Sequence, residues 1–574
     1  MKKMKVINKI NKVFTFDFES RNSYKDIEKG ETSIWLWDIC DYQLNHFQGE
    51  NMESFIEKIS ELAPCVLYSH NLKFDSSFII SWMLANGYKY KQEDITKPKE
   101  FMMLMDEMSR LYSINLCVKT KKGNRLIQFR DSAKKLSGKV KNIAESYQLP
   151  IRKGEIDYRK ERDLNYKATP HELEYIKNDT EIIERVLIME YEEGFKSLTS
   201  SSDAFHKYVE FIGQKNFDKL FPQMSLEDDQ FVRSAYKGAW CYANPKYKGK
   251  ILHNVKAFDK NSMYTYQMCS RLLPYGKPLK YKENKIRNIY SYPLFITHCR
   301  VCCHLKPNSF PCIQTYKTLF AKAQWLTDTL LEMEELYLTS VDYEMLYKYY
   351  IVDDIEIIET MYFHASTNLF KEFLMPIYEL KCNSKGSRKM NAKKLLNSCY
   401  GKFGQNPRQR NRKAVLDEDG VVKYIIYKDE VGKTKYCPES AFITAWGRYD
   451  IVDGANRNYN KFAYCDTDSL HIICDDNELP NLDIDSKKLG AFKIEHDFNR
   501  VKYIGTKCYY GEEWIDGKLS KNPTIAGLSK EEGVKKVDFE TFEIGEKYES
   551  VKLTPRMVKG GIVLLDSDFV LRER

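Results

Sequence analysis

Alternating apolar and polar positions predict a β-strand close to the N-terminus. In VFTFDFES, residues 13–20, three phenylalanines occupy every second position and alternate with Thr15, Asp17 and Glu19. Residues two apart on a strand share a face, so the two carboxylates project side by side opposite an apolar face. This pattern fits a carboxylate site, and it fits equally well a half-buried strand whose acidic face is solvated.

A second run, LYSHNLKFDSSFIISWML at residues 67–84, predicts a short apolar strand followed by an apolar helix. His70 and Asn71 lie between the two elements, and Asp75 lies in the first turn of the helix. A carboxylate in that turn favours the helix dipole without any further role. Its closeness to His70 and Asn71 nevertheless suggests a polar site at this junction.

The stretch TPHELEYIKNDTEIIERVL, residues 169–187, begins as helices do. Thr169 is a capping hydroxyl, a proline follows, and Glu172 takes the capping-box position. We expect this helix to run to about residue 194, with Tyr175 and Asp179 on one face because they are four residues apart. Strand-like and helical segments alternate through the first 200 residues, which predicts an α/β domain.

Later in the chain, FAYCDTDSLHII, residues 462–473, predicts two strands joined by a tight turn. Asp466 and Asp468 stand at the tip of that turn. Carboxylates this close repel each other, and bound divalent cations would relieve the repulsion.

A third carboxylate for such a site comes from KAFDKNSMYTYQM, residues 256–268. Asp259 ends a short apolar strand, and a turn and Tyr264 follow it. Taken alone, Asp259 is equally well explained as an ordinary turn residue.

A helix with a basic face is predicted for SRKMNAKKLLNSCYGKF, residues 387–403. Lys389, Lys393 and Asn397 recur every four residues and Tyr400 follows three later, so all four share a face that ends at Gly401. Such a face suits a triphosphate. The alternative is a solvated lysine face, although the asparagine, tyrosine and glycine are unusual choices for one.

Composition indicates a multidomain chain with a mild basic excess. Its 574 residues exceed what one hydrophobic core accommodates. The 90 Lys and Arg against 81 Asp and Glu give a net charge of +9, which fits a polyanionic partner or the coding bias of an AT-rich gene. The N-terminus has no secretory pattern, no apolar run reaches the roughly 18 residues of a membrane span, and the 15 scattered cysteines suit reduced thiols in a cytoplasm.

Two further motifs lack part of the pattern that their chemistry requires. In THCRVCCHL, residues 297–305, Cys299 and Cys302 have zinc-ligand spacing, but a second such pair is missing, so we expect a strand with cysteines in the core. In VGKT, residues 431–434, a phosphate-binding loop would need glycine where Tyr427 stands.

The three acidic stretches of the first third together resemble the signatures of the DEDDy 3′–5′ exonucleases, which have an RNase H-like fold. The resemblance implies two divalent metal ions, with Tyr175 helping to orient the attacking water. Hard oxygen ligands favour Mg²⁺, and we expect Mn²⁺ to substitute. The implied ligands are Asp17, Glu19, Asp75 and Asp179.

Two more segments resemble one branch of that group, the small protein-primed phage polymerases. KGEIDYRKER, residues 153–162, implies a catalytic Lys153, and it adds Glu155, where that branch has Asp, as a further metal ligand. RDSAKKL, residues 130–136, matches a segment that touches single-stranded DNA. The implied DNA contacts are His70, Asn71, Phe74, Ser132 and Tyr158.

The later stretches resemble, in order, motifs A, B and C of family B DNA polymerases: D-x-x-S-x-Y, K-x-x-x-N-S-x-Y-G and Y-x-D-T-D-S. This implies nucleotidyl transfer with two metal ions held by Asp259, Asp466, Asp468 and the carbonyl of Lys260. Tyr264 is expected to exclude a ribose 2′-hydroxyl. The implied nucleotide-binding residues are Tyr264, Lys381, Lys393, Asn397 and Tyr400.

Further segments narrow the resemblance to the phi-twenty-nine-like protein-primed phage polymerases, over essentially the whole chain. They are AYKGAW at 235–240, FITAWGRY at 442–449 and TKCYYG at 506–511. The implied primer–template contacts are Tyr236, Gly238, Ser262, Thr444, Arg448, Lys507 and Tyr509.

The same resemblance predicts the domain plan. It implies a multidomain α/β and α+β chain with an RNase H-like exonuclease domain at 1–199 and a right-hand polymerase domain at 200–574. Within the second domain it predicts a palm at about 200–270 and 437–539, a first insertion at 271–368, fingers at 369–404, a second insertion at 405–436 and a thumb at 540–574. The first insertion is expected to hold a terminal protein, and the second to help encircle DNA.

The function implied is a replicative DNA polymerase with proofreading, processive and strand-displacing, in the cytoplasm of an infected bacterial host. Its expected partners are primer–template and single-stranded DNA, deoxynucleoside triphosphates and a phage terminal protein, with no membrane span and a monomeric or terminal-protein-bound state. One alternative is an exonuclease whose C-terminal part only binds nucleic acid, and another is a non-catalytic zinc-dependent DNA-binding protein. The complete set Asp259, Asp466 and Asp468 disfavours the first, and the missing cysteine pair disfavours the second.

Overall fold

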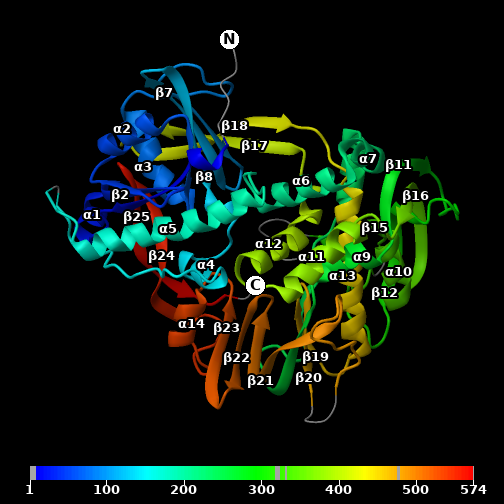
Figure 1. The fold of residues 1–574 in the computed structure, drawn as a ribbon. Coiled ribbons are helices and arrows are strands. Elements are labelled where there is room, and N and C mark those ends of the chain that lie inside the picture. The colour runs from blue at the N-terminus through cyan, green and yellow to red at the C-terminus, as the bar shows by residue number, and fades with distance from the viewer. Residues whose placement is uncertain (1–7, 164, 317–323, 330–331, 475–478, 573–574) are drawn as a thin grey trace.

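Three large sheets and three hairpins organise the computed structural model, which describes residues 8–163, 165–316, 324–329, 332–474 and 479–572. Figure 1 shows the N-terminal sheet at one end of the molecule and the later sheets at the other, with helices between them. Along the described residues, no helix combines the length and apolarity that crossing a membrane requires.

The N-terminal sheet has eight strands in the order β3-β2-β1-β4-β8-β7-β6-β5. Strand β1 pairs antiparallel with β2 and parallel with β4. The bounds are β1 (Val13–Ser20), β2 (Ile34–Asp41), β3 (His46–Gly49), β4 (Cys65–Ser69), β5 (Lys89–Tyr90), β6 (Glu100–Met105), β7 (Leu111–Thr120) and β8 (Gly123–Asp131). The α/β prediction for this region is confirmed.

Helices cover both faces of this sheet. Helices α2 (Met52–Leu62) and α3 (Leu72–Ala85) pack on one face, where the three phenylalanines of β1 join their core. Helices α4 (Val140–Ser146) and α5 (Pro170–Glu192) pack on the other. The predicted alternation of β1 is therefore confirmed, and its carboxylates lie on the α5 side. Helix α5 begins with the predicted capping box of Thr169 and Glu172 and ends two residues before the predicted end.

A seven-stranded sheet forms the centre of the C-terminal part, in the order β23-β22-β21-β10-β20-β19-β9. Helices α9 (Met263–Ser270) and α13 (Pro438–Arg457) pack against it. The predicted strand, turn and strand at residues 462–473 are confirmed as β19 and β20. The strand bounds are β9 (Cys241–Ala243), β10 (Ile251–Lys260), β19 (Phe462–Asp466), β20 (Ser469–Ile473), β21 (Phe492–Gly505), β22 (Cys508–Ile515) and β23 (Lys518–Ile525).

A bundle of helices lies between the two sheets. Aromatic and aliphatic side chains from all its members share one core, together with part of α13. The basic-faced helix is confirmed as α12, although its α-helical part ends at Ser398 and a 3-10 turn, Tyr400–Lys402, continues it. The bundle consists of α6 (Ser200–Ile212), α7 (Gln214–Leu220), α8 (Leu226–Ala235), α11 (Lys371–Asn383) and α12 (Gly386–Ser398).

A four-stranded sheet, β11-β16-β12-β15, and helix α10 (Ser340–Tyr349) fall within the predicted first insertion, part of which lies outside the described residues. Its strands are β11 (Leu273–Lys282), β12 (Leu294–Leu305), β15 (Glu334–Thr339) and β16 (Tyr350–Ser366), with a small hairpin of β13 (Gln314–Tyr316) and β14 (Gln324–Trp325) beside them. The cysteine-rich stretch is strand β12, as predicted. Cys299, Cys303 and Cys312 are packed in one apolar core.

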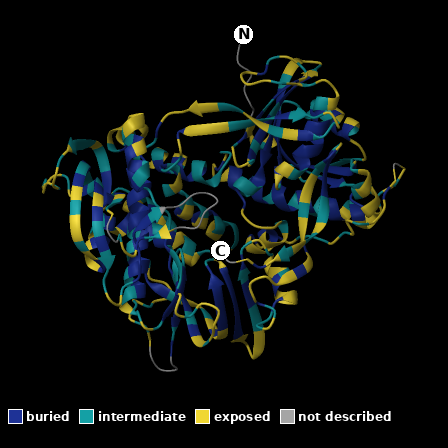
Figure 2. Ribbon diagram, turned by 180° about the vertical axis from the view of Figure 1, so that it is seen from behind, coloured by how far each residue is buried: buried dark blue, intermediate teal, exposed yellow. Residues whose placement is uncertain are grey.

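Two hairpins bridge the N-terminal and C-terminal parts of the molecule. The first is β17 (Arg408–Leu416) with β18 (Val422–Val431), and the second is β24 (Lys547–Val558) with β25 (Gly561–Val570), preceded by α14 (Lys530–Lys536). Strand β18 occupies much of the polar stretch 417–438. Residues exposed on both faces of this hairpin hide the period that marks a half-buried strand (Figure 2).

Candidate active sites

The first candidate site is a cavity of about 290 Å³ beside β1. It is lined by the four carboxylates that were predicted as ligands of one metal centre: Asp17, Glu19, Asp75 and Asp179. Strand β1 supplies the first two, the first turn of α3 the third, and α5 the fourth. We call this set the first carboxylate site.

Its carboxylate oxygens are buried and only partly satisfied by the protein. Asp17 accepts a hydrogen bond from the backbone N–H of Phe18 at 3.0 Å, and Asp75 accepts one from the Ser69 hydroxyl. One oxygen each of Asp75 and Asp179 is buried without a hydrogen-bond partner. Buried acceptors left over in this way fit ligands of a cation.

Burial raises the pKa of every carboxyl in this site, and like charges raise the pKa of Asp17, Glu19 and Asp75 further. The pKa of Asp17 rises to about 7, chiefly through burial and then through Asp179. Burial and neighbouring carboxylates likewise raise the pKa of Glu19 and of Asp75, and burial raises that of Asp179. Carboxyls that resist ionisation together become a favourable ligand set once a divalent cation supplies the opposite charge.

Lys153, Tyr158 and Tyr175 line the same cavity, as predicted from the resemblance. The Lys153 ammonium pairs with Asp179 and lies 4.9 Å from the centre of the Tyr175 ring. The Tyr158 and Tyr175 hydroxyls are 2.8 Å apart. Glu155 is an exception, because it is exposed and does not line the cavity; its expected role as a metal ligand is corrected.

Three of the predicted DNA contacts, His70, Asn71 and Phe74, lie at the mouth of this cavity. Ser132 differs, since its side chain is fully buried. Its hydroxyl bonds the Ser69 carbonyl at 3.1 Å and lies 3.0 Å from Nδ1 of His70. Ser132 thus supports the His70 loop from inside, which corrects the expectation that it touches DNA directly.

The second candidate site gathers three carboxylates at one end of the seven-stranded sheet. Asp259 ends β10 and Asp466 ends β19, and both neighbour Ser469 of the intervening strand β20. Asp468 lies in the turn, where Thr467 adopts a left-handed φ of 64°. The carbonyl of Asp468 accepts a hydrogen bond from the backbone N–H of Lys260 at 2.8 Å, which fixes the turn against β10. We call Asp259, Asp466 and Asp468 the second carboxylate site.

Cationic and polar groups contact these carboxylates. Lys493 pairs with Asp259 at 2.6 Å, and Lys507 lies 3.4 Å from Asp466. Cys241 also reaches Asp466, at 3.2 Å. The pKa of Asp468 is raised to about 6, first by burial and then by Asp259. The side chain of Lys260, whose carbonyl was the predicted ligand, points elsewhere and pairs with Asp450 at 3.3 Å.

Three lysines lie near this site on the side of the helix bundle. Lys381 of α11 donates to the Ser262 hydroxyl at 2.7 Å. Burial lowers the pKa of Lys381, and the ammonium groups of Lys493 and Lys393 lower it further, so the three cations are close in space. Lys493 was missed by the sequence analysis. Its place opposite Asp259 depends on pairing between strands 234 residues apart, which no local pattern signals.

The predicted sugar-contacting residues come together beside the same carboxylates. The rings of Tyr264 and Tyr400 are 4.5 Å apart. A side chain at Gly447 of α13 would meet Tyr264, since an added Cβ would lie 3.3 Å from its ring. Lys393 and Asn397 of α12 line a different cavity, of about 340 Å³, whose other walls come from residues 133–147 and the start of α6.

The predicted primer–template residues divide into accessible and buried groups. Lys507 is exposed and Tyr236 and Gly238 are half-buried, whereas Tyr509, close to Lys507 in β22, is only 8% exposed. Arg448 is only 2 % exposed, pairs with Asp342 at 2.7 Å and donates to the Gly238 carbonyl at 2.9 Å. Thr444 is buried too. Direct DNA contact by these two is therefore corrected: Arg448 holds the Tyr236–Gly238 backbone from beneath.

Neither carboxylate site has three ligand-type side chains already converging on one point, among the residues described. Lysine ammonium groups already lie on these carboxylates: Lys153 on Asp179 in the first site, and Lys493 on Asp259 and Lys507 near Asp466 in the second. A divalent cation would displace these ammonium groups, and short side-chain rotations would complete its ligand shell. The donor sets, all oxygen and largely buried, fit Mg²⁺ or Mn²⁺.

Comparison with known proteins gives concordant matches. The family model described as DNA polymerase type B, organellar and viral, matches residues 60–486. The DNA polymerase of Bacillus phage M2 is 36% identical, covering 98% of this chain and 100% of the relative. That of Bacillus phage phi29 is 35% identical, covering 98% and 99%. The solved phi29 polymerase complexed with primer-template DNA and incoming nucleotides superposes with a TM-score of 0.90 at 33% identity, covering 98% of this chain and 100% of that one.

Proposed function

Because the chain belongs to the type B DNA polymerases and to their phi29-like phage branch, we propose that it is a replicative polymerase that also proofreads, displaces strands and starts from a protein primer. DNA synthesis itself follows from membership of the family. What we propose is the role of each residue, the activities besides DNA synthesis, and the partners. The observation that carries it is the meeting of Asp259, Asp466 and Asp468 with the lysines of α11, α12 and β21.

Nucleotide addition is assigned to the second carboxylate site. Its three carboxylates would hold Mg²⁺, which when bound neutralises phosphate charge and lowers the pKa of a 3′-hydroxyl. Lys381 and Lys393 are assigned to the triphosphate, with Lys493 as a third cation once Asp259 is engaged elsewhere. An ammonium close to developing pyrophosphate charge stabilises the transition state more than the ground state.

Sugar selection is assigned to Tyr264. Its ring is held between Tyr400 and the backbone at Gly447, so it cannot easily move aside for an extra hydroxyl. Rigid aromatic walls of this kind discriminate by exclusion.

Proofreading is assigned to the first carboxylate site. Asp17, Glu19, Asp75 and Asp179 provide an oxygen-rich cavity of their own, formed entirely from other elements than the second site. Tyr175 and Lys153 stand beside it as groups to orient water and to balance charge. A solved phi29 polymerase is complexed with single-stranded DNA, which supports such a strand as a ligand of this chain.

Strand displacement is supported by the way the two hairpins meet. Val421, at the tip of β17–β18, bridges to Lys559 at the tip of β24–β25, and Lys559 pairs with Glu31 of the N-terminal domain at 2.9 Å. Side chains of both hairpins join the core around α3. A closed ring of this kind would retain DNA and exclude the non-template strand.

We propose a terminal protein as primer, because the resemblance to the protein-primed phage polymerases spans essentially the whole chain, and action in the cytoplasm of an infected bacterium, which the phage relatives support. We propose the sheet β11-β16-β12-β15 and its neighbouring elements as the docking surface for that protein, because this sheet occupies the predicted first insertion.

Extension of a 5′-labelled primer around a primed single-stranded circle, with and without Mg²⁺, tests the proposal. We expect products longer than the circle, which require displacement of the new strand. Synthesis that stops after one circuit would contradict strand displacement. Degradation without any synthesis would favour the alternative, a nuclease with a DNA-binding C-terminal part.

A further inference from the structure

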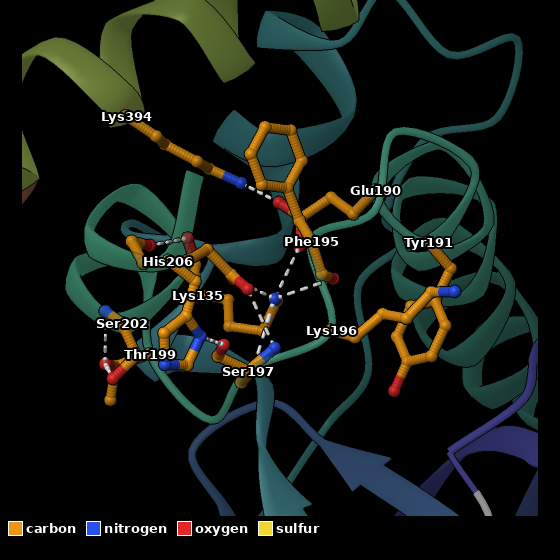
Figure 3. A network of polar contacts seen from close by, with 12 residues as sticks. Lys135, Glu190, Tyr191, Phe195, Lys196, Ser197, Thr199, Ser202, His206 and Lys394 are labelled. Atoms are coloured by element: carbon orange, nitrogen blue, oxygen red, sulfur yellow. Dashed lines mark hydrogen bonds and ion pairs between the residues drawn. The ribbon is translucent and has the colours of Figure 1, made fainter. Parts of the chain in front are cut away.

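Four ionised side chains form a buried network where the N-terminal domain meets the helix bundle (Figure 3). We call Lys135, Glu190, Asp203 and Lys394 the junction network. The side chains of Lys135 and Glu190 are each 1% exposed, that of Asp203 is 6% exposed and that of Lys394 is 19% exposed. Charges are buried in this way only when they are paired.

Lys135 holds in place the segment that connects α5 to α6. Its ammonium donates to the carbonyls of Phe195 and Ser197 at 3.0 and 3.2 Å, and to Asp203 of α6 at 2.5 Å. Asp203 in turn accepts from the backbone N–H of Ser197 at 2.8 Å. The chain from α5 to α6 is thereby held along its course, and Figure 3 shows these groups converging on the Lys135 ammonium.

Glu190 links Lys135, beside the α5–α6 connection, to Lys394 of α12. One of its oxygens lies 3.4 Å from the Lys135 ammonium, and the other accepts from Lys394. Glu190 belongs to α5, which also bears Asp179 and Tyr175. The Lys394 ammonium also lies 5.5 Å from the centre of the Tyr147 ring, and the Tyr147 hydroxyl is 3.4 Å from Asn391, one turn earlier in α12.

Other contacts of α12 and the turn after it reach α9, which packs against the seven-stranded sheet. The Leu396 carbonyl is 3.4 Å from the Thr265 hydroxyl, and Tyr400 packs on Tyr264. The helix therefore spans two bodies, and Lys394 is its charged attachment to the first. Lys394 directly follows Lys393 and stands three residues before Asn397, so its attachment fixes the turn from which both predicted nucleotide ligands project.

We infer that Glu190 and Lys135 are positioning residues for nucleotide binding, acting through Lys394 on the orientation of α12. Removal of one partner leaves the others buried and unbalanced, which favours separation of the helix from α5. When the groups that bind a ligand are displaced by a small distance, their interaction with the ligand is weakened but not abolished. The inference rests on the proposed role of α12 in holding the triphosphate.

The test compares steady-state kinetics of single-nucleotide insertion in the parent and in Lys394→Met, which keeps the length of the side chain and removes its charge. We expect KM for the nucleotide to rise about tenfold, while kcat at saturating nucleotide stays within about twofold. Lys394→Arg, which retains the charge, should restore KM to near the parent value. Exonuclease activity on single-stranded DNA should be unchanged, because no ligand of the first carboxylate site is altered.

A matched control is Arg388→Met, which removes a positive charge from an exposed position of the same helix. An equal rise of KM in this control would overturn the inference, since net charge rather than the network would then be responsible. Glu190→Gln should raise KM as Lys394→Met does, and the double variant should raise it no further. Strict additivity would overturn the coupling.

Lys393→Ala separates this inference from the function on which it rests. A raised KM in Lys393→Ala with an unchanged KM in Lys394→Met would refute the positioning role and leave the proposed function intact. An unchanged KM in both would refute the nucleotide-binding role of α12 and the inference with it. Should Lys394→Met fold poorly, Lys394→Leu, which likewise removes both the charge and the donor for Glu190, is measured against the same limits, and an unchanged KM again refutes the positioning role.

Discussion

Several carboxylates of this protein lie at positions where they lower the stability of the fold and serve the proposed function. The turn at Asp466 and Asp468 combines two acidic side chains with the left-handed backbone of Thr467, next to a strand pair that is mostly buried. Neither the repulsion nor the backbone strain helps folding. Both are consistent with a ligand-binding turn that is completed only when cations arrive.

The first residue-scale prediction is that Asp468→Asn reduces nucleotide addition by about a thousandfold, because a metal contact is worth several kcal/mol in the transition state. The Tm without metal should hold or rise, since burial already raises the pKa of this carboxyl to about 6. Primer extension and thermal unfolding measure the two effects. The control is Asp497→Asn, an exposed carboxylate of the same sheet; similar loss there would argue against a specific role.

Tyr264 gives a second prediction at this scale. Tyr264→Val should weaken discrimination against ribonucleotides by about a hundredfold, because it removes the ring that closes the sugar site. Tyr264→Phe keeps the ring and should discriminate as the parent does. Competition between the two nucleotide types in single-insertion assays measures the ratio, and equal ratios for Val and Phe would exclude a steric gate.

Asp17 gives a third prediction, on pH. Its pKa is raised from 3.8 to about 7 in the folded protein, so the folded state retains a proton that the unfolded chain releases. Stability without metal should therefore fall as pH rises from about 4 to about 7. Asp17→Asn should flatten this fall, and Mg²⁺ should reduce it in the parent. Thermal unfolding of the first transition at several pH values provides the measurement; a steeper fall in Asp17→Asn would contradict the assignment.

At the scale of elements, two hairpins connect parts of the molecule that are far apart in the sequence. The β17–β18 hairpin reaches from the helix bundle to α3 and meets the β24–β25 hairpin at Lys559. Its strands are largely exposed, so the hairpin is held by its tip and a few apolar side chains such as Ala414 and Val422 (Figure 2). Few elements of the fold are attached through so small a core.

The fourth prediction concerns this element. Replacement of residues 409–430 by a short glycine-serine turn should leave extension on a short primed template nearly intact, since both carboxylate sites lie elsewhere. The length synthesised per binding event, and synthesis through duplex, should fall by about tenfold or more, because the ring is opened. Single-turnover extension with a DNA trap distinguishes the two. Unchanged processivity would contradict a closed ring.

At the scale of the whole molecule, two carboxylate sites are built on two separate sheets. The first depends on the eight-stranded sheet with α3 and α5, and the second on the seven-stranded sheet with α11 and α12. Figure 1 shows the helix bundle between them. Chemistry at either site can therefore be lost alone, even though the junction network connects the bodies.

The fifth prediction follows from this separation. Asp17→Ala with Glu19→Ala should abolish 3′–5′ degradation of single-stranded DNA and leave the rate of nucleotide addition within about twofold, because neither side chain contacts the second sheet. Nuclease and insertion assays on the same preparation make the comparison. Parallel loss of both activities would show that the two sites are not independent.

The sequence by itself predicted most of the elements and the carboxylates that the structure gathers into two sites. Alternation in β1, the capping box of α5 and the paired acids between β19 and β20 are local signals, because backbone geometry fixes which near neighbours share a face. The motifs also named carboxylates from distant segments as sets, and the structure brings the first set together around a cavity and the second at one end of the seven-stranded sheet.

Only the tertiary structure decided which polar residues are accessible and which distant charges meet. Arg448 and Ser132 lie in motifs that suggest DNA contact, yet packing buries both behind the backbone they support. Lys493 reaches Asp259 through strand pairing, and Glu190 reaches Lys394 through the packing of two helices 204 residues apart. Contacts between residues so far apart depend on the register of whole elements, which local sequence patterns do not encode.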